Sequence, residues 1–199
     1  MVRRETLSRK IRLIPIWIVY VSGIVPGFFL FVNGYRNSLG PDPVKVIEHE
    51  LGSYALKFLL VVLFITPIDK TFKLGLTKYR RAIGLLSFWY ALAHVLSYII
   101  LDKQFYWDEI GKDLIKRPFI ILGFLSFSIL LVLAITSNNW SIRRLGGLVW
   151  KKLHLFVYVA TLLAAIHFVM LVKAWPMEPL VYLTLILSLI IYRVIRSKI

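Results

Sequence analysis

The sequence contains no cysteine among its 199 residues, and this absence removes several kinds of chemistry at once. Without thiols the chain has no disulfide, thiolate nucleophile, iron–sulfur cluster, cysteine zinc site or covalently attached c-type haem. Acidic residues are also scarce, with 10 Asp and Glu against 25 Lys and Arg, and there are four histidines. Any bound metal must therefore be held by histidines or carboxylates.

Apolar residues are in excess, at 59% of the chain. A soluble domain has about 45–50% apolar residues, and a basic nucleic-acid-binding domain is polar overall. A hydrophobic chain with a formal net charge of +15 is instead typical of a multi-span membrane protein whose cations lie in loops. Composition therefore excludes a soluble domain and favours a membrane protein.

Six apolar runs are long enough to cross a hydrocarbon core, which takes about 17–25 residues each. No loop is long enough to hold a soluble domain, and we find no internal repeat and no nucleotide-binding motif. We expect an all-α bundle of six transmembrane helices that forms a single domain over residues 1–199. The predicted spans are Ile11–Val32, Leu51–Pro67, Ile83–Leu101, Pro118–Thr136, Leu153–Val172 and Pro179–Ile195.

The loop charges are distributed unequally between the two sides of the membrane. One side has 17 cations and two acids, Glu5 and Asp69, while the other has equal numbers of cations and acids. The positive-inside rule then predicts that both termini are cytoplasmic. The 17 cations are Arg3, Arg4, Arg9, Lys10, Arg12, Lys70, Lys73, Lys78, Arg80, Arg81, Arg143, Arg144, Lys151, Lys152, Arg193, Arg196 and Lys198.

Histidine is the polar residue that the predicted spans offer for chemistry. No Asp or Glu lies well inside a predicted span, which argues against a proton- or cation-coupled transporter. His94 lies 13 residues past Arg81 in the third span, and His167 lies 15 residues past Lys152 in the fifth. Both spans run from inside to outside, so we expect the two imidazoles at nearly the same depth. They are then candidate ligands of one iron from opposite sides.

Two imidazoles across an apolar gap, with no cysteine, suit a non-covalent b-type haem. The alternative is that each histidine only hydrogen-bonds a neighbouring helix. His154 lies 13 residues before His167, which puts it roughly 20 Å deeper and about 140° around an ideal helix. It cannot share the same iron, and it shares a helix face with His167 only if the helix bends or contains a π-bulge.

Four further residues are weaker candidates. Lys57 is either a lysine that reaches up to the headgroups or a counter-charge for a haem propionate. Arg80 and Arg81 either mark the inner boundary of the third span or hold a carboxylate or phosphate of a cofactor. His49, outside the second predicted span, is interpreted as an interfacial loop residue.

Several blocks of the sequence resemble the MsrQ (YedZ) family of the ferric reductase-like transmembrane group. The resemblance covers nearly the whole chain. Besides the fifth-span run with its two histidines, the blocks are GPDPVKVIEHELGSYALKFLL leading into FITPI, YRRAIGLLSFWYALAHVLSYIILD and KRPFIILGFLSFSILLVLAITS.

This resemblance implies a haem b protein of the bacterial inner membrane, with His94, His154 and His167 at haem-ligand positions. It implies outward electron transfer to MsrP, a periplasmic molybdopterin enzyme that reduces methionine sulfoxide in proteins. Implied donors are the quinone pool or a cytoplasmic flavin reductase, with FMN as a further cofactor. A second haem on His154 stays open, because the matching position of the third span holds Arg80 or Arg81.

Two other functions stay open beside this one. The first is a stand-alone ferric or oxygen reductase, although the sequence has no recognisable FAD- or NADPH-binding domain. The second is a small transporter or scaffold whose histidines are structural. In the favoured interpretation the chain transfers electrons and makes no bonds itself, and the sulfoxide chemistry takes place in its partner.

Overall fold

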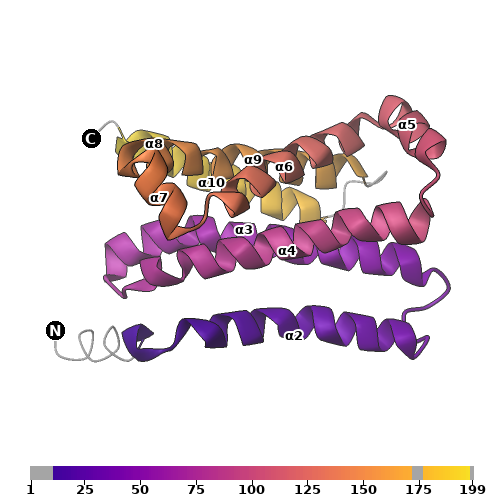
Figure 1. Cartoon of the computed structure of the whole chain (residues 1–199), viewed down its shortest axis with the longest axis horizontal. Helices are drawn as coiled ribbons and strands as arrows, with labels where there is room; N and C mark the ends of the chain where they lie inside the picture. Colours follow the sequence, from indigo (N-terminus) through magenta and orange to yellow (C-terminus); the bar gives the residue numbers. More distant parts are fainter. Residues whose placement is uncertain (1–10, 172–176, 198–199) are drawn as a thin grey trace. The chain divides into compact units, whose positions relative to one another are not determined.

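The computed structural model describes residues 11–171 and 177–197, and this part of the chain is helical without a β-strand (Figure 1). The described residues form six helical segments that are long and apolar enough to cross a membrane. The protein is therefore a multi-pass membrane protein, and the predicted all-α class with six spans is confirmed. The segments are Ile16–Tyr35, Pro43–Phe72, Leu76–Asp102, Pro118–Ile135, Gly147–Leu171 and Met177–Arg196.

Two of these segments, Leu76–Asp102 and Gly147–Leu171, contain more than one element, and the short helices α5 and α7 lie between segments. The cytoplasmic location of both termini and the single domain are not tested by the structure and stay predictions. The elements are α2 (Ile16–Tyr35), α3 (Pro43–Phe72), the 3-10 helix η1 (Leu76–Tyr79), α4 (Arg80–Ser97), the π-helix η2 (Tyr98–Asp102), α5 (Trp107–Lys116), α6 (Pro118–Ile135), α7 (Asn139–Leu145), α8 (Gly147–His154), α9 (Phe156–Leu171) and α10 (Met177–Ser197).

The second span is longer than the sequence predicts. Helix α3 begins at Pro43, eight residues before the predicted start at Leu51. The Asp42 side chain caps this helix by accepting the backbone N–H of Lys45 at 3.2 Å, and proline is well suited to the first helical position. Residues 48–50 are polar, so the hydropathy pattern places the start of the span after them and misses the first two turns of the helix. His49 consequently lies in a helix and not in a loop.

The predicted fourth and sixth spans lie within two residues of the observed ones, whereas the first begins five residues later than predicted and the third and fifth begin seven and six residues earlier. Two predicted loops contain helices, α5 and α7. In the fifth span, α8 ends at His154 and α9 begins at Phe156, so the single turn residue Leu155 lies between them. Some residues used to predict the orientation lie outside the described part of the chain. They are Arg3, Arg4, Glu5, Arg9, Lys10, Lys173 and Lys198.

The chain divides into two compact units, residues 1–97 and 98–199. In the first unit, α4 runs beside α3, and α2 packs against both (Figure 1). Leu51, Leu59 and Leu63 of α3 are almost fully buried there. In the second unit, α9 packs between α6 and α10, and Ala160 and Ile186 are fully buried. Each unit thus contains one tightly packed helix pair, α3 with α4 and α6 with α9.

A tyrosine hydroxyl holds α2 against α4. Pro26 has no N–H to donate to the carbonyl of residue 22 in α2. Beside this position, the Tyr90 hydroxyl of α4 donates to the carbonyl of Gly23 at 2.7 Å and accepts from the N–H of Gly27 at 2.9 Å. Both polar groups of α2 are therefore satisfied in an apolar environment.

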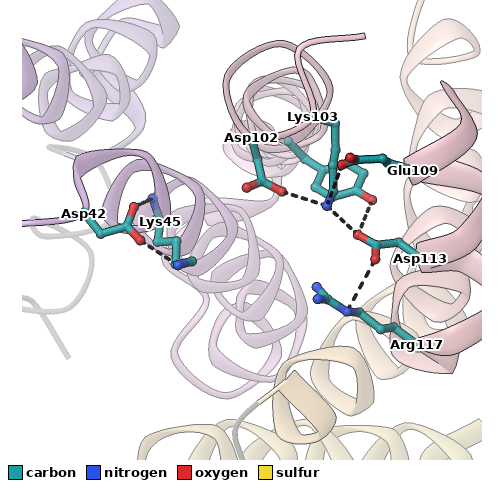
Figure 2. Close-up of polar contacts among 8 residues, drawn as sticks. Asp42, Lys45, Asp102, Lys103, Glu109, Asp113 and Arg117 are labelled. Atoms are coloured by element: carbon teal, nitrogen blue, oxygen red, sulfur yellow. Dashed lines mark hydrogen bonds and ion pairs between the residues drawn. The ribbon is translucent and has the colours of Figure 1, made fainter. Parts of the chain in front are cut away.

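The segment that follows α4 ends in a charged cluster, which we call the Lys103 cluster (Figure 2). The Nζ atom of Lys103 lies 2.8 Å from a carboxylate oxygen of Asp113, and the other oxygen of that carboxylate lies 3.6 Å from Nε of Arg117. Lys103 Nζ also lies 3.5 Å from Asp102, and the Tyr98 hydroxyl donates to Asp113 at 3.2 Å. The cluster fastens α5 to the π-helical turn η2.

The Lys103 cluster changes the pKa values of its members. Burial raises the pKa of Asp113, but the hydrogen bond from Lys103 and the positive charges of Arg117 and Lys103 outweigh it, so the net pKa lies below the usual 3.8. The same hydrogen bond raises the pKa of Lys103 above 10.5, although burial opposes this. Both groups are therefore charged over the whole range between these two values.

We expect Tyr90→Phe to lower the free energy of unfolding by about 1–2 kcal/mol, because two backbone groups of α2 lose their partner. The stacking of the ring on Phe58, at 5.4 Å between centroids, is kept by phenylalanine. Denaturant titration in detergent micelles measures this change. Tyr35→Phe is the matched control, because Tyr35 is 92% exposed. Equal unfolding curves for the two variants would contradict the assigned role of the hydroxyl.

We expect Asp113→Asn to lower the free energy of unfolding at pH 7 by about 1–3 kcal/mol, because Lys103 and Arg117 lose their shared carboxylate. Since the pKa of Asp113 is lowered in the folded state, its contribution is present above pH 3.8 and is lost as the pH falls below that value. The variant should therefore lose less stability than the parent on acidification.

Thermal unfolding in detergent between pH 7 and pH 3 tests this expectation. The control is Asp108→Asn, an exposed carboxylate on the same helix, whose replacement should cost less than about 1 kcal/mol. The interpretation of the Lys103 cluster is wrong if Asp113→Asn and the parent lose stability in parallel as the pH falls.

Candidate functional site

His94 is held by the helix next to its own. Its ring nitrogen Nδ1 lies 2.8 Å from the backbone carbonyl oxygen of Glu48 on α3. One turn further along α3 is Gly52, and a Cβ atom at this glycine would lie only 3.2 Å from Nδ1 and 3.3 Å from Cε1 of the ring. The half-buried imidazole therefore lies against bare backbone.

His167 has the same kind of seat in the second unit. Its Nδ1 lies 2.6 Å from the backbone carbonyl oxygen of Phe119 on α6. Gly123 is one turn further along α6, and a Cβ atom there would lie 3.0 Å from both Nδ1 and Cε1. The Phe119 ring lies beside the imidazole, at 5.8 Å between centroids. Each candidate histidine is thus paired with a carbonyl and a glycine four residues later.

A hydrogen bond from a serine hydroxyl connects the two helices of each pair a second time. On both helices it lies seven residues from the contact between the histidine and the carbonyl. In the first unit, Ser87 donates to the carbonyl of Ala55 at 2.9 Å. In the second, Ser126 donates to the carbonyl of Ala160 at 2.8 Å. Ser87 and Ala160 each precede their histidine by seven residues, so both helix pairs have the same register. The structure therefore contains a local repeat that the sequence analysis missed.

These contacts determine the protonation of both imidazoles. A carbonyl oxygen can only accept a hydrogen bond, so Nδ1 of His94 and of His167 must carry the proton and donate it. In a neutral imidazole the other nitrogen, Nε2, then has the lone pair. A metal-binding histidine usually donates its second N–H to a carbonyl or carboxylate in this way. The geometry of both rings is therefore suited to ligation through Nε2.

His154 has different surroundings. Its Nδ1 lies 3.1 Å from the carbonyl oxygen of Trp150 in its own helix, and its Nε2 lies 3.3 Å from the hydroxyl of Ser137. The ring also stacks on the Trp150 indole at 3.9 Å between centroids. Both nitrogens thus contact protein groups at the end of α8. Only the turn residue Leu155, whose backbone stays in the right-handed helical region, separates α8 from α9, so the angle between His154 and His167 stays a prediction.

The remaining predicted residues lie on α3 and α4 and have protein neighbours. The ammonium of Lys57 lies 5.5 Å from the centre of the Tyr54 ring, one turn toward the predicted outer end of α3. Arg80 donates to the hydroxyl of Thr66 at 3.3 Å, and Arg81 is exposed. Neither alternative given above for the three cations is tested by these contacts. Roles toward a cofactor stay predictions for all of them.

His94 lies in the first unit, whereas His154 and His167 lie in the second. A common depth and a shared iron for His94 and His167 therefore stay predictions. The sequence analysis missed the seats of both rings, that is, the carbonyls and glycines of α3 and α6. A signal is nevertheless present. Both glycine helices contain the pattern Leu-Gly-x-x-small, at residues 51–55 and at residues 122–126. In addition, a small residue lies seven positions before each of these two histidines, Ser87 before His94 and Ala160 before His167.

Comparisons with known proteins identify the family of the chain. The model of the family described as ferric reductase like transmembrane component matches residues 51–177, which include all three span histidines. The chain is 46% identical over 181 residues to the protein-methionine-sulfoxide reductase heme-binding subunit MsrQ of Brucella anthropi, covering 91% of this chain and 82% of that protein. The MsrQ proteins of Brucella ovis and Brucella canis are 45% identical with the same coverage. The chain therefore belongs to the MsrQ family of ferric reductase-like transmembrane proteins.

Proposed function

We propose that this protein binds a non-covalent haem b and transfers electrons as the membrane subunit of a protein-methionine-sulfoxide reductase. The observation that carries the proposal is the matched pair of histidine seats. Two imidazoles in apolar helix pairs each donate Nδ1–H to a backbone carbonyl, at 2.8 Å for His94 and 2.6 Å for His167. The printed name of the Brucella relatives, heme-binding subunit, supports the same cofactor.

The residues fit haem iron by their chemistry. Neutral imidazole nitrogens are strong iron ligands, and we propose that Nε2 of His94 and of His167 would hold the haem iron. Two strong nitrogen ligands would favour electron transfer over oxygen binding. When bound, the haem supplies a one-electron carrier. The protein's own contribution is to hold both rings in one tautomer and to surround them with apolar side chains that exclude water.

We further propose that the outer haem held by His94 and His167 is the main electron carrier. His154 lies on the predicted cytoplasmic side of this path, either at a second haem or near FMN. The contact of its Nε2 with the Ser137 hydroxyl at 3.3 Å supports a role beside the path in preference to a second iron site. Lys57, Arg80 and Arg81 are the cations we assign to the acidic groups of the cofactors. FMN itself rests on the family resemblance.

The direction of electron transfer follows from the predicted orientation. With the basic side in the cytoplasm, electrons enter from the quinone pool or a cytoplasmic flavin reductase of the bacterial inner membrane. They leave on the periplasmic side to an MsrP-type molybdopterin enzyme, where methionine sulfoxide is reduced. The relatives' printed name connects them with a methionine sulfoxide reductase. This chain would thereby support the repair of oxidised periplasmic proteins.

The first expected result is a b-type absorption spectrum for the purified protein after reduction with dithionite. His94→Ala and His167→Ala should each lose most of the haem, because each removes an axial ligand. His154→Ala should keep the haem of the other two histidines. His49→Ala is a matched control, since this partly exposed ring lies beside Glu50 at the start of α3. Haem per protein, measured as the pyridine complex, also distinguishes one haem from two.

Two outcomes of this measurement would reject parts of the proposal. If His94→Ala and His167→Ala both keep full haem absorbance, the ligand assignment is wrong. If the wild-type protein is folded and active without haem, a transporter or scaffold with structural histidines would be favoured. A second haem that disappears only in His154→Ala would assign that histidine to its own iron.

The second expected result concerns the acceptor. Dithionite-reduced haem in right-side-out membrane vesicles should be reoxidised by added molybdopterin methionine-sulfoxide reductase with its substrate, and inverted vesicles should not respond. Ferric citrate is the comparison, because the family match with ferric reductases makes iron reduction the competing function. Fast reoxidation by ferric citrate without any response to the partner enzyme would favour a stand-alone ferric reductase.

A further inference from the structure

The two glycines beside the histidines have an unusual environment. For a Cβ atom added at Gly52, the three nearest heavy atoms all belong to the His94 ring, at 3.2–3.6 Å. For a Cβ atom at Gly123, all three belong to the His167 ring, at 3.0–3.4 Å. The shortest of these distances, 3.2 Å at Gly52 and 3.0 Å at Gly123, are tighter than an ordinary methyl contact, so each ring would have to shift by a few tenths of an ångström. Each glycine is therefore fitted to an imidazole and not to a neighbouring helix backbone.

The helix pairs have little freedom to move apart. The Ser87 bond to Ala55 and the Ser126 bond to Ala160 fix the spacing of each pair seven residues from the histidine. Ser87, Ala160 and Ser126 are buried, and breaking a buried hydrogen bond is unfavourable. A methyl group at either glycine would therefore displace the imidazole rather than the helix. The displaced ring would move away from the carbonyl that accepts its Nδ1 proton.

We propose that Gly52 and Gly123 are positioning residues that orient the two iron ligands, one in each helix pair, by allowing Nδ1–H to reach a backbone carbonyl. This inference rests on the proposed haem ligation by His94 and His167. A hydrogen bond from Nδ1–H makes an imidazole a more basic ligand, and a basic ligand stabilises ferric over ferrous iron. The two glycines thus help to set both the angle of each ring and the reduction potential.

The test compares Gly52→Ala and Gly123→Ala with two other glycine substitutions. In Gly84→Ala of α4 the nearest atom to the new methyl is Val62 Cγ2 at 4.0 Å, and in Gly111→Ala of α5 no atom lies within 4 Å. Both controls should match the parent in haem content, potential and spectrum. Alanine is also a better helix former than glycine, so the substitution itself does not weaken a helix.

We expect both positioning variants to bind haem about 10–100-fold more weakly, the usual effect of losing a group that orients a metal ligand. Their midpoint potentials should be higher than that of the parent. Their low-spin ferric EPR signals should change, because the principal g values depend on ring orientation. Haem titration, redox titration and EPR of the full chain measure these quantities. Parent-like potentials and EPR signals in both variants would overturn the proposal.

Double variants distinguish a positioning role from a role in helix packing. If Gly52→Ala or Gly123→Ala fails to fold, Gly52→Ala/His94→Ala and Gly123→Ala/His167→Ala should regain the fold, because the ring that meets the methyl is gone. Circular dichroism and gel filtration of the haem-free proteins measure this. A double variant that still fails to fold shows that the glycine is needed for packing, and the proposal is then wrong.

These measurements also separate the inference from the proposed function. Haem retained in His94→Ala and His167→Ala would reject the ligands, whereas the coupling of each glycine to its histidine in the haem-free fold would remain. Normal loss of haem in the histidine variants, combined with parent-like properties of the glycine variants, would reject only the positioning role.

Discussion

The hydrogen bond from an imidazole Nδ1–H to a backbone carbonyl is the interaction on which the candidate site depends. In an apolar helix pair an unpartnered N–H is costly, so the proton stays on the nitrogen that faces the carbonyl. That choice of tautomer gives Nε2 the lone pair in His94 and in His167 alike. A Cβ atom at Gly52 or Gly123 would come within 3.2 or 3.0 Å of the ring, so the close approach of each ring depends on glycine. Protonation and ring direction are therefore both consequences of one bond.

The same solution occurs twice, in α3 with α4 and in α6 with α9. The order of the parts is inverted between the two pairs, since the serine is on the histidine helix in the first pair and on the glycine helix in the second. In both pairs a serine hydroxyl donates to an alanine carbonyl at the same distance from the histidine, whichever helix contains the serine. His154 lacks this arrangement, because it bonds to its own helix and to Ser137, and no glycine notch faces it among the described contacts.

The six spans could be predicted because lipid imposes a simple rule, that backbone groups must bond within an apolar helix of sufficient length. The start of α3 could not be predicted from hydropathy, because its first turns contain Glu48, His49 and Glu50 and depend on the local cap at Asp42. The short helices α5 and α7 were missed for a related reason, because they are not apolar runs. The histidines were found as rare polar residues in apolar segments. The carbonyls that accept their hydrogen bonds could not be found, because the register of two packed helices decides which carbonyl lies beside which ring.

Two opposing effects act on the potential of the proposed haem. An apolar surrounding disfavours the extra positive charge of ferric iron and so raises the potential. The ion pair of Lys103 with Asp113 lies beyond the end of the third span. The carbonyl bonds to both imidazoles act in the other direction, since they make the ligands more electron-rich. A subunit that passes electrons onward needs a potential between those of its donor and its acceptor. In this fold the apolar surrounding comes from all the side chains of the helix pair. The opposing effect on the potential depends on only one carbonyl and one glycine for each ring. A single substitution at one of these glycines is therefore expected to change the potential while the rest of the helix pair stays the same.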